Sequence, residues 1–181
     1  MAYPRRLFLR LSLRTFTDSV PAMVPPCVFA FVDDGLAWST LREVTAIPVA
    51  LALLSPLWAA WRTRALVRAA RGLGIPVSEN ALDRTQTHTL TGVPLSLVRT
   101  ELGAARRASG VGDGNPVGFS WRPFRGKASA DGSVTYEEAS GETRVELRAG
   151  KGLKTDTAVF HGAVFLALCQ TVRTIEPGST K

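Results

Sequence analysis

Three residues near the C-terminal end have the types needed for nucleophilic catalysis. Asp156, His161 and Cys169 supply a carboxylate, an imidazole and a thiol, which can orient, accept a proton and attack. We predict a helix over residues 155–177, and positions 161 and 169 share one face of it. Two helical turns still separate them by about 12 Å along the axis, which is too far for the hydrogen bond that activates a thiol. The sequence therefore predicts a core histidine here.

The other residues capable of chemistry are isolated from one another. His88 stands alone in a threonine-rich stretch, and two distant histidines with two separate cysteines form neither a metal site nor a disulfide framework. Glu137 and Glu138 are adjacent, so in a strand they point to opposite faces. Segment 110–118, GVGDGNPVG, lacks the flanking strand, the helix and the lysine of a phosphate-binding loop. We expect no catalytic residue, no metal and no cofactor.

Aromatic side chains in the C-terminal half offer a different chemistry, the binding of a small apolar ligand. A pocket between a sheet and the long last helix could hold such a ligand, although the same side chains describe an ordinary core. The predicted lining consists of Phe119, Trp121, Phe124, Phe160, His161 and Phe165. Both interpretations stay open, and the core is the favoured one.

The positive charge of the chain is concentrated in its apolar half. The 181 residues carry a formal net charge of +7. Residues 1–74 hold nine arginines and four acidic residues (net +5), and residues 75–181 hold thirteen basic and eleven acidic residues (net +2). Arginines beside apolar segments are typical of membrane proteins, whereas a nucleic-acid-binding domain carries its charge on the folded half. We therefore expect membrane lipid, and not nucleic acid, as a partner.

The longest apolar run ends in tryptophans and arginines. Val44–Trp61 contains eighteen uncharged residues, equivalent to about 27 Å of helix, against a bilayer core of roughly 30 Å. Trp58 and Trp61 lie at its end, where interfacial aromatic residues are common. The arginines that follow, and that would flank the membrane, are Arg62, Arg64, Arg68 and Arg71. The pattern predicts a span near residues 44–61 with a basic helical extension over 62–72.

A shorter apolar run precedes it. Val20–Val32 contains thirteen uncharged residues and three prolines, and a span near residues 20–38 would need the following GLAW to complete it. Residues 1–19 form a basic N-terminus that fits either an amphipathic helix on anionic lipid or a strand with alternating leucines.

Basic flanks on both outer sides and an acidic turn between the runs favour a helical hairpin in a membrane segment spanning residues 20–74. Both ends of such a hairpin would lie in the cytoplasm. A single span is the alternative. A soluble protein with a core helix at 44–61 is the third interpretation, which the lack of a polar face on that run disfavours.

From residue 76 to residue 181 the sequence is that of a globular domain. We predict a strand over 84–92 and a helix over 93–110. Three strands in GFSWRPF, GSVTYEEA and ETRVELRAG follow, and then the last helix. The order β-α-β-β-β-α predicts an α+β domain with helices on one face of an antiparallel sheet. High Ala, Arg and Gly content indicates a bacterial source.

The function we expect is non-enzymatic. The chain would hold a cytoplasmic interaction or ligand-sensing domain at the cell membrane, with a protein or a small apolar ligand as its partner. One alternative is a soluble or peripheral protein that binds lipid or a small molecule, and another is an enzyme whose site the sequence hides. A third is RNA binding, because the order helix, three strands, helix resembles that of double-stranded RNA-binding domains, with Lys151 and Lys154 before the last helix. The net charge of +2, the additional first strand and the acidic Asp156 argue against RNA.

Overall fold

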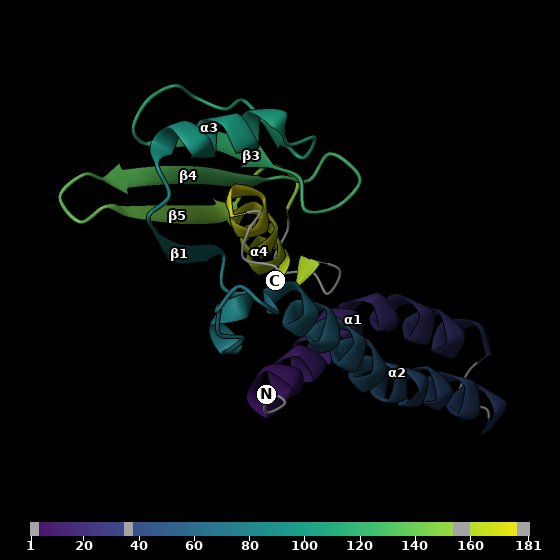
Figure 1. Ribbon diagram of the computed structural model, residues 1–181. Coiled ribbons are helices and arrows are strands. Elements are labelled where there is room, and N and C mark those ends of the chain that lie inside the picture. The colour runs from purple at the N-terminus through teal and green to yellow at the C-terminus, as the bar shows by residue number, and fades with distance from the viewer. Residues whose placement is uncertain (1–3, 35–37, 154–159, 177–181) are drawn as a thin grey trace. The chain divides into compact units, whose positions relative to one another are not determined.

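The chain folds into two compact units, Met1–Ala65 and Leu66–Lys181 (Figure 1). The computed structural model describes residues 4–34, 38–153 and 160–176, and within its helices the side chains of residues 21–45, 47, 48 and 51 are not described.

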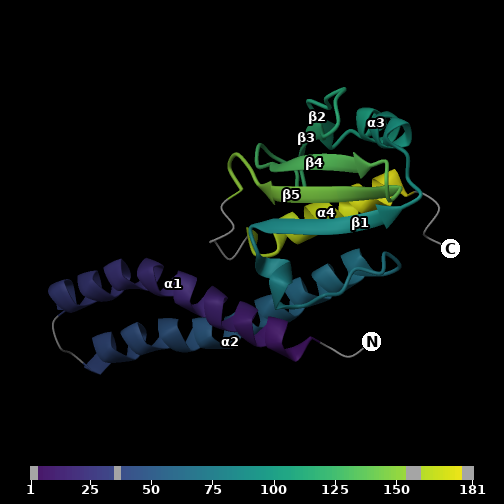
Figure 2. The ribbon, with the colours of Figure 1, turned by 90° about the vertical axis from the view of Figure 1, so that its left-hand side faces the viewer.

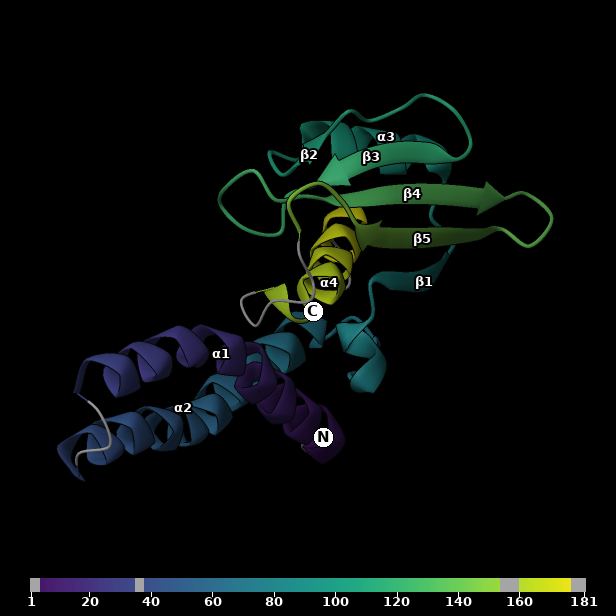
Figure 3. The same ribbon diagram turned by 180° about the vertical axis from the view of Figure 1, so that it is seen from behind.

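The N-terminal unit consists of two long helices. Helix α1 spans Arg5–Asp34 and helix α2 spans Trp38–Ala70, so α2 continues a short way into the second unit. The two helices run side by side in opposite directions (Figures 1 and 3). The choice between helix and strand for the N-terminus is resolved as helix, because the buried residues Leu7, Leu11 and Thr15 recur every four positions.

The structure does not support the transmembrane spans predicted near residues 20–38 and 44–61. In the described part of the chain, no helix combines the length and the hydropathy needed to cross a bilayer. Insertion into a bilayer depends on how apolar each residue is, and not only on the number of uncharged residues in a row. Five of the eighteen residues of Val44–Trp61 are alanine, and the first run shares its helix with the arginines of the N-terminus.

The C-terminal unit is an α+β domain, as predicted from the order of its elements. Its strands pair antiparallel in the order β1-β5-β4-β3-β2. The strands are β1 Thr85–Thr91, β2 Ala108–Ser109, β3 Val117–Trp121, β4 Ala130–Glu137 and β5 Glu142–Ala149. The helices are the 3-10 helix η1 Glu79–Leu82, α3 Leu95–Ala104 and α4 Ala163–Ile175.

One face of this sheet is buried and the other is open. On β5, Val145 and Leu147 are buried while Arg144 and Arg148 are exposed, and the other long strands alternate in the same way. Helix α4 contacts β1, β5 and α3, and α3 contacts β2 and β4 (Figure 2). Both helices therefore cover the buried face, and no helix of the described part of this unit covers the open one.

The last helix begins later than the sequence predicts. Helix α4 starts at Ala163, directly after Gly162, whose φ of 69° lies in the left-handed region that favours glycine. A Cβ atom on Gly162 would lie 2.9 Å from the Leu66 side chain, so glycine also permits a close approach at this point. The first residues of the predicted helix, 155–159, lie outside the described residues.

Candidate functional site

The thiol and the imidazole of the candidate nucleophilic set are core groups. His161 lies in the turn before α4 and not on the helix, so no helical spacing relates it to Cys169. Both residues are 1% exposed. Burial raises the pKa of the Cys169 thiol to about 12, so the thiol stays protonated at neutral pH and is a poor nucleophile. The third member of the set, Asp156, is outside the described residues.

His88 lies half-buried on β1. Burial lowers the pKa of its imidazole, and the nearby carboxylate of Glu176 raises it. The residue lines a shallow hollow of about 330 Å³ together with Gln86 and Phe165. Among the residues that the structure describes, no group of three His, Cys, Asp or Glu side chains is placed to hold a metal ion.

The residues predicted to line an apolar pocket lie in two places. Phe119, Trp121 and Phe165 are at most 5% exposed on the buried side of the domain. The Phe119 ring covers Gly132 on the neighbouring strand so closely that a Cβ atom there would overlap it. Phe124 and Phe160 form a tilted pair of rings, with centroids 6.1 Å apart and planes at 45° to each other. This is the packing of a filled core, and a ligand pocket beneath these rings remains a prediction.

The residues predicted to flank a membrane differ in exposure. Arg64, Arg68 and Arg71 are exposed, and Trp61 is 54% exposed with its ring centroid 5.0 Å from that of Trp58. Arg62 is only 3% exposed, and this burial lowers the pKa of its guanidinium to about 10. The sequence grouped Arg62 with the other arginines, but the structure places it on the buried side of α2.

The N-terminal unit exposes large apolar side chains and buries several polar ones. Leu13, Leu53 and Leu57 are each about two-thirds exposed, at 65%, 66% and 66%. Ser55 and Thr63, in contrast, are 4% and 0% exposed. A protein surface in water normally shows the reverse distribution, and a contiguous apolar surface marks a place where another apolar phase or molecule binds.

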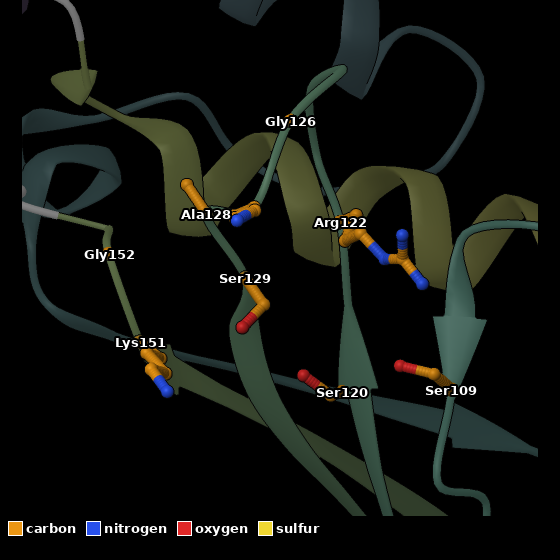
Figure 4. A pocket seen from close by; sticks show the side chains of 9 residues that line it. Ser109, Ser120, Arg122, Gly126, Ala128, Ser129, Lys151 and Gly152 are labelled. Atoms are coloured by element: carbon orange, nitrogen blue, oxygen red, sulfur yellow. The ribbon is translucent and has the colours of Figure 1, made fainter.

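The C-terminal unit has a basic hollow of about 600 Å³ at one end of its sheet, on the open face (Figure 4). Its walls come from the ends of β2 and β3, from the loop that joins β3 to β4, and from the turn after β5. The lining residues are Ser109, Ser120, Arg122, Gly126, Lys127, Ala128, Ser129, Lys151 and Gly152. In the view of Figure 4 Ser129, Ser120 and Ser109 lie in a row, with Lys151 beyond Ser129 and Arg122 above Ser120 and Ser109.

Backbone hydrogen bonds fix the segments that carry these side chains. The Arg122 N–H donates to the Arg107 carbonyl at 3.0 Å, which continues the β2–β3 pairing past its last strand residue. The Ser129 N–H donates to the Lys151 carbonyl at 3.0 Å, and the Gly150 N–H donates to the Ser129 carbonyl at 3.1 Å. Arg122, Ser129 and Lys151 are therefore held in place by the sheet, although their side chains reach solvent.

The three cations of the hollow are Arg122, Lys127 and Lys151. Within the described ranges of the chain, none of them forms an ion pair, and the three serine hydroxyls form no side-chain hydrogen bond. The nearest acidic residue along the strands is Asp131, the register partner of Ser120, and it is not part of the lining. The arrangement can therefore attract an anion and offer it several donors.

The sequence pattern placed Ser109 in a predicted helix and Ser120 and Arg122 in a predicted strand, and Lys151 entered only through the resemblance to RNA-binding domains. The available signal was the topology: in an antiparallel meander, the β3–β4 loop and the segment after β5 lie at the same end of the sheet. Both segments combine Lys with Gly or Ser, as RGKAS and GKG. Pairing the two would have predicted the site.

Comparison with known proteins found no matching family model, no similar curated protein and no similar solved structure.

Proposed function

We propose that this chain is a membrane-attached, non-enzymatic binding protein. In this proposal the N-terminal helices embed their apolar outer side chains in one leaflet of the cell membrane. The C-terminal α+β domain remains on the cytoplasmic side as an interaction or ligand-sensing domain. The attachment is interfacial, because no described helix is long and apolar enough to cross the bilayer.

The observation that carries the proposal is that the N-terminal unit exposes large apolar side chains while it buries polar ones. Leu53 and Leu57 are each 66% exposed while Ser55, between them in the sequence, is 4% exposed. Burying a leucine side chain in an apolar phase contributes roughly 1.5–3 kcal/mol. Lipid acyl chains would bury the exposed Leu53 and Leu57 side chains. The buried Ser55 would not have to move.

Charge and aromatic residues favour lipid over a protein as the apolar partner. Arg5, Arg6 and Arg64 are exposed on the same two helices as the outward leucines, and cations near an apolar surface bind anionic headgroups. Trp61, 54% exposed, is of the residue type that concentrates at the boundary between acyl chains and water.

Vesicle flotation tests the proposal. The full 181-residue chain should float with vesicles of phosphatidylcholine and phosphatidylglycerol. The double substitution L53Q/L57Q should weaken that binding at least tenfold, by a rough estimate from the lost apolar burial. L97Q is the matched control, because Leu97 is also exposed, at 38%, but lies on α3 of the other unit.

The result that overturns the proposal is equally specific. Full-length chain that stays at the bottom of the gradient with every vesicle composition would exclude membrane attachment. So would L53Q/L57Q floating as well as L97Q. If sedimentation then showed self-association that L53Q/L57Q abolishes, the apolar surface would be an interface between copies of the chain.

A further inference from the structure

We infer that the basic hollow of the C-terminal unit binds the phosphoryl group of a phosphate monoester. The inference goes beyond membrane attachment, because the hollow belongs wholly to the α+β domain. Its donors are the side chains of Ser109, Ser120, Arg122, Lys127, Ser129 and Lys151.

The donor set matches the chemistry of a phosphoryl group. A monoester dianion presents three acceptor oxygens, and an arginine can donate to two of them at once through its planar guanidinium. Lysine ammonium groups add charge without a fixed direction, and serine hydroxyls rotate to donate to whichever oxygen remains. Charge-assisted hydrogen bonds of this kind are roughly twice as strong as neutral ones.

The positions of the donors support a single bound group. Arg122, Ser129 and Lys151 come from different segments, and backbone hydrogen bonds hold each segment to its neighbour, so little rearrangement is needed on binding. A Cβ atom on Gly152, which has a φ of 75°, would lie 3.5 Å from the Ala128 Cα, so the turn after β5 lies within van der Waals contact of the β3–β4 loop. The two cation-bearing segments thus meet at the rim of the hollow.

The charge around the hollow remains positive when its neighbours are counted. The lining carries three basic residues and no acidic one. On the same face, Asp131 lies in register between Ser120 and Arg148, and Arg148 forms an ion pair with Glu146 at 3.7 Å. These described neighbours add two carboxylates and one guanidinium to the three cations of the lining. The Asp131 carboxylate lies against Gly150, where a Cβ atom would approach it to 2.6 Å. A dianion in the hollow therefore finds a net attraction.

The lining also indicates which part of a ligand is recognised. About 600 Å³ is enough for a phosphoryl group and a small attached moiety. None of the nine lining residues is aromatic, so the hollow has no surface on which a nucleobase could stack. The phosphoryl group itself is then the recognised element, whether it belongs to a soluble monoester or to the headgroup of phosphatidic acid.

Calorimetric titration of the full-length chain in non-ionic detergent micelles tests this inference. Inorganic phosphate should bind saturably. R122Q/K151Q should weaken that binding at least about tenfold, since two charge-assisted contacts are lost. The matched control is R106Q/R144Q, which removes the same charge from exposed positions of the same unit outside the hollow. It should weaken binding by no more than about threefold, because only distant, screened charge is lost.

Three results would overturn the inference. They are the absence of saturable phosphate binding, equal weakening by the two double variants, and displacement of phosphate by duplex RNA that binds far more tightly than any monoester. Thermal unfolding of each variant confirms that it is folded. Because no vesicle is present, the outcome is independent of whether the N-terminal helices attach to membranes.

The same titration identifies the source of the phosphoryl group. Glycerol 3-phosphate and short-chain phosphatidic acid present the same headgroup chemistry. Tighter binding of the phosphatidic acid that R122Q/K151Q weakens would assign the hollow to lipid headgroups, and equal or weaker binding would assign it to a soluble monoester. Either result supports the inference.

Discussion

Cys169 has the chemical type of a nucleophile and the surroundings of a core residue. Its side chain is 1% exposed, and burial is the main cause that raises the pKa of its thiol from 9.0 to about 12, opposed by the nearby Arg173. The native chain therefore keeps the thiol proton to a higher pH than the unfolded chain does. Residue type alone suggested catalysis, and burial decides against it.

This pKa difference predicts how stability depends on pH. Between pH 9 and pH 12 the native state binds more protons than the unfolded state at this site. The free energy of unfolding should therefore fall as pH rises, by roughly 1.4 kcal/mol per pH unit. Below pH 9 both states are protonated, so the contribution is fully present. Urea unfolding on either side of pH 9 measures the effect.

The control for this prediction is C169A. Other groups titrate in the same range, so the informative quantity is the difference between the two chains. In C169A the free energy of unfolding should fall less steeply with pH, because the contribution of the Cys169 thiol is gone. Cys27 is present in both chains, so its contribution cancels in the difference. Identical slopes would mean that Cys169 ionises as readily in the native state as in the unfolded one.

At the scale of elements, the strands of the C-terminal unit follow from local pattern. The alternation in ETRVELRA predicted β5, and threonine-rich alternation predicted β1. The start of α4 could not be predicted in this way, because the break before Ala163 depends on Gly162 meeting Leu66, a residue far away in the sequence. The basic hollow was missed for the same reason, since it joins segments that only the sheet brings together.

One contact ties α4 to the strand that borders the basic hollow. The Trp121 indole N–H donates to Gln170 Oε1 at 3.0 Å, and the Gln170 amide donates to the Pro123 carbonyl at 3.5 Å. Gln170 thus connects the helix to β3 and to the start of the β3–β4 loop. Trp121 is 2% exposed, so an indole N–H left without an acceptor there is costly.

We expect Q170L to lower the free energy of unfolding by about 1–3 kcal/mol, because it removes the acceptor of a buried donor. A double-mutant cycle with W121F isolates this contact from the general cost of each change. In the W121F background Q170L should cost clearly less, since no indole N–H remains to be satisfied. Purely additive effects in urea unfolding would show that the hydrogen bond does not contribute.

At the scale of the whole molecule, the two units divide the chemical character of the chain between them. Outward apolar side chains such as Leu53 and Leu57 belong to the unit of residues 1–65. The sheet, the basic hollow and eleven of the fifteen acidic residues belong to residues 66–181. Counting uncharged residues overestimated the helices as membrane spans, because it gave alanine the same weight as leucine.

This division predicts which arginines respond to lipid charge. Arg5, Arg6 and Arg64 are exposed on the helical unit, and a basic side chain near an anionic membrane contributes about 1 kcal/mol. R5Q/R6Q/R64Q should therefore weaken binding to anionic vesicles roughly a hundredfold and flatten its salt dependence. Binding to vesicles of phosphatidylcholine alone should change little, because these vesicles carry no net charge and binding to them depends on the burial of apolar side chains.

The control for this prediction changes the same charge elsewhere. R106Q/R125Q/R144Q alters three exposed arginines of the C-terminal unit, so both triple variants move from a net charge of +7 to +4, which is 7 − 3. Flotation with anionic vesicles over a range of salt concentrations should then distinguish the two variants. The control should bind these vesicles with nearly the affinity and salt dependence of the unmodified chain. If both variants lost the same affinity, attraction to lipid would depend on total charge, and the helical unit would have no special part in orienting the chain at the membrane.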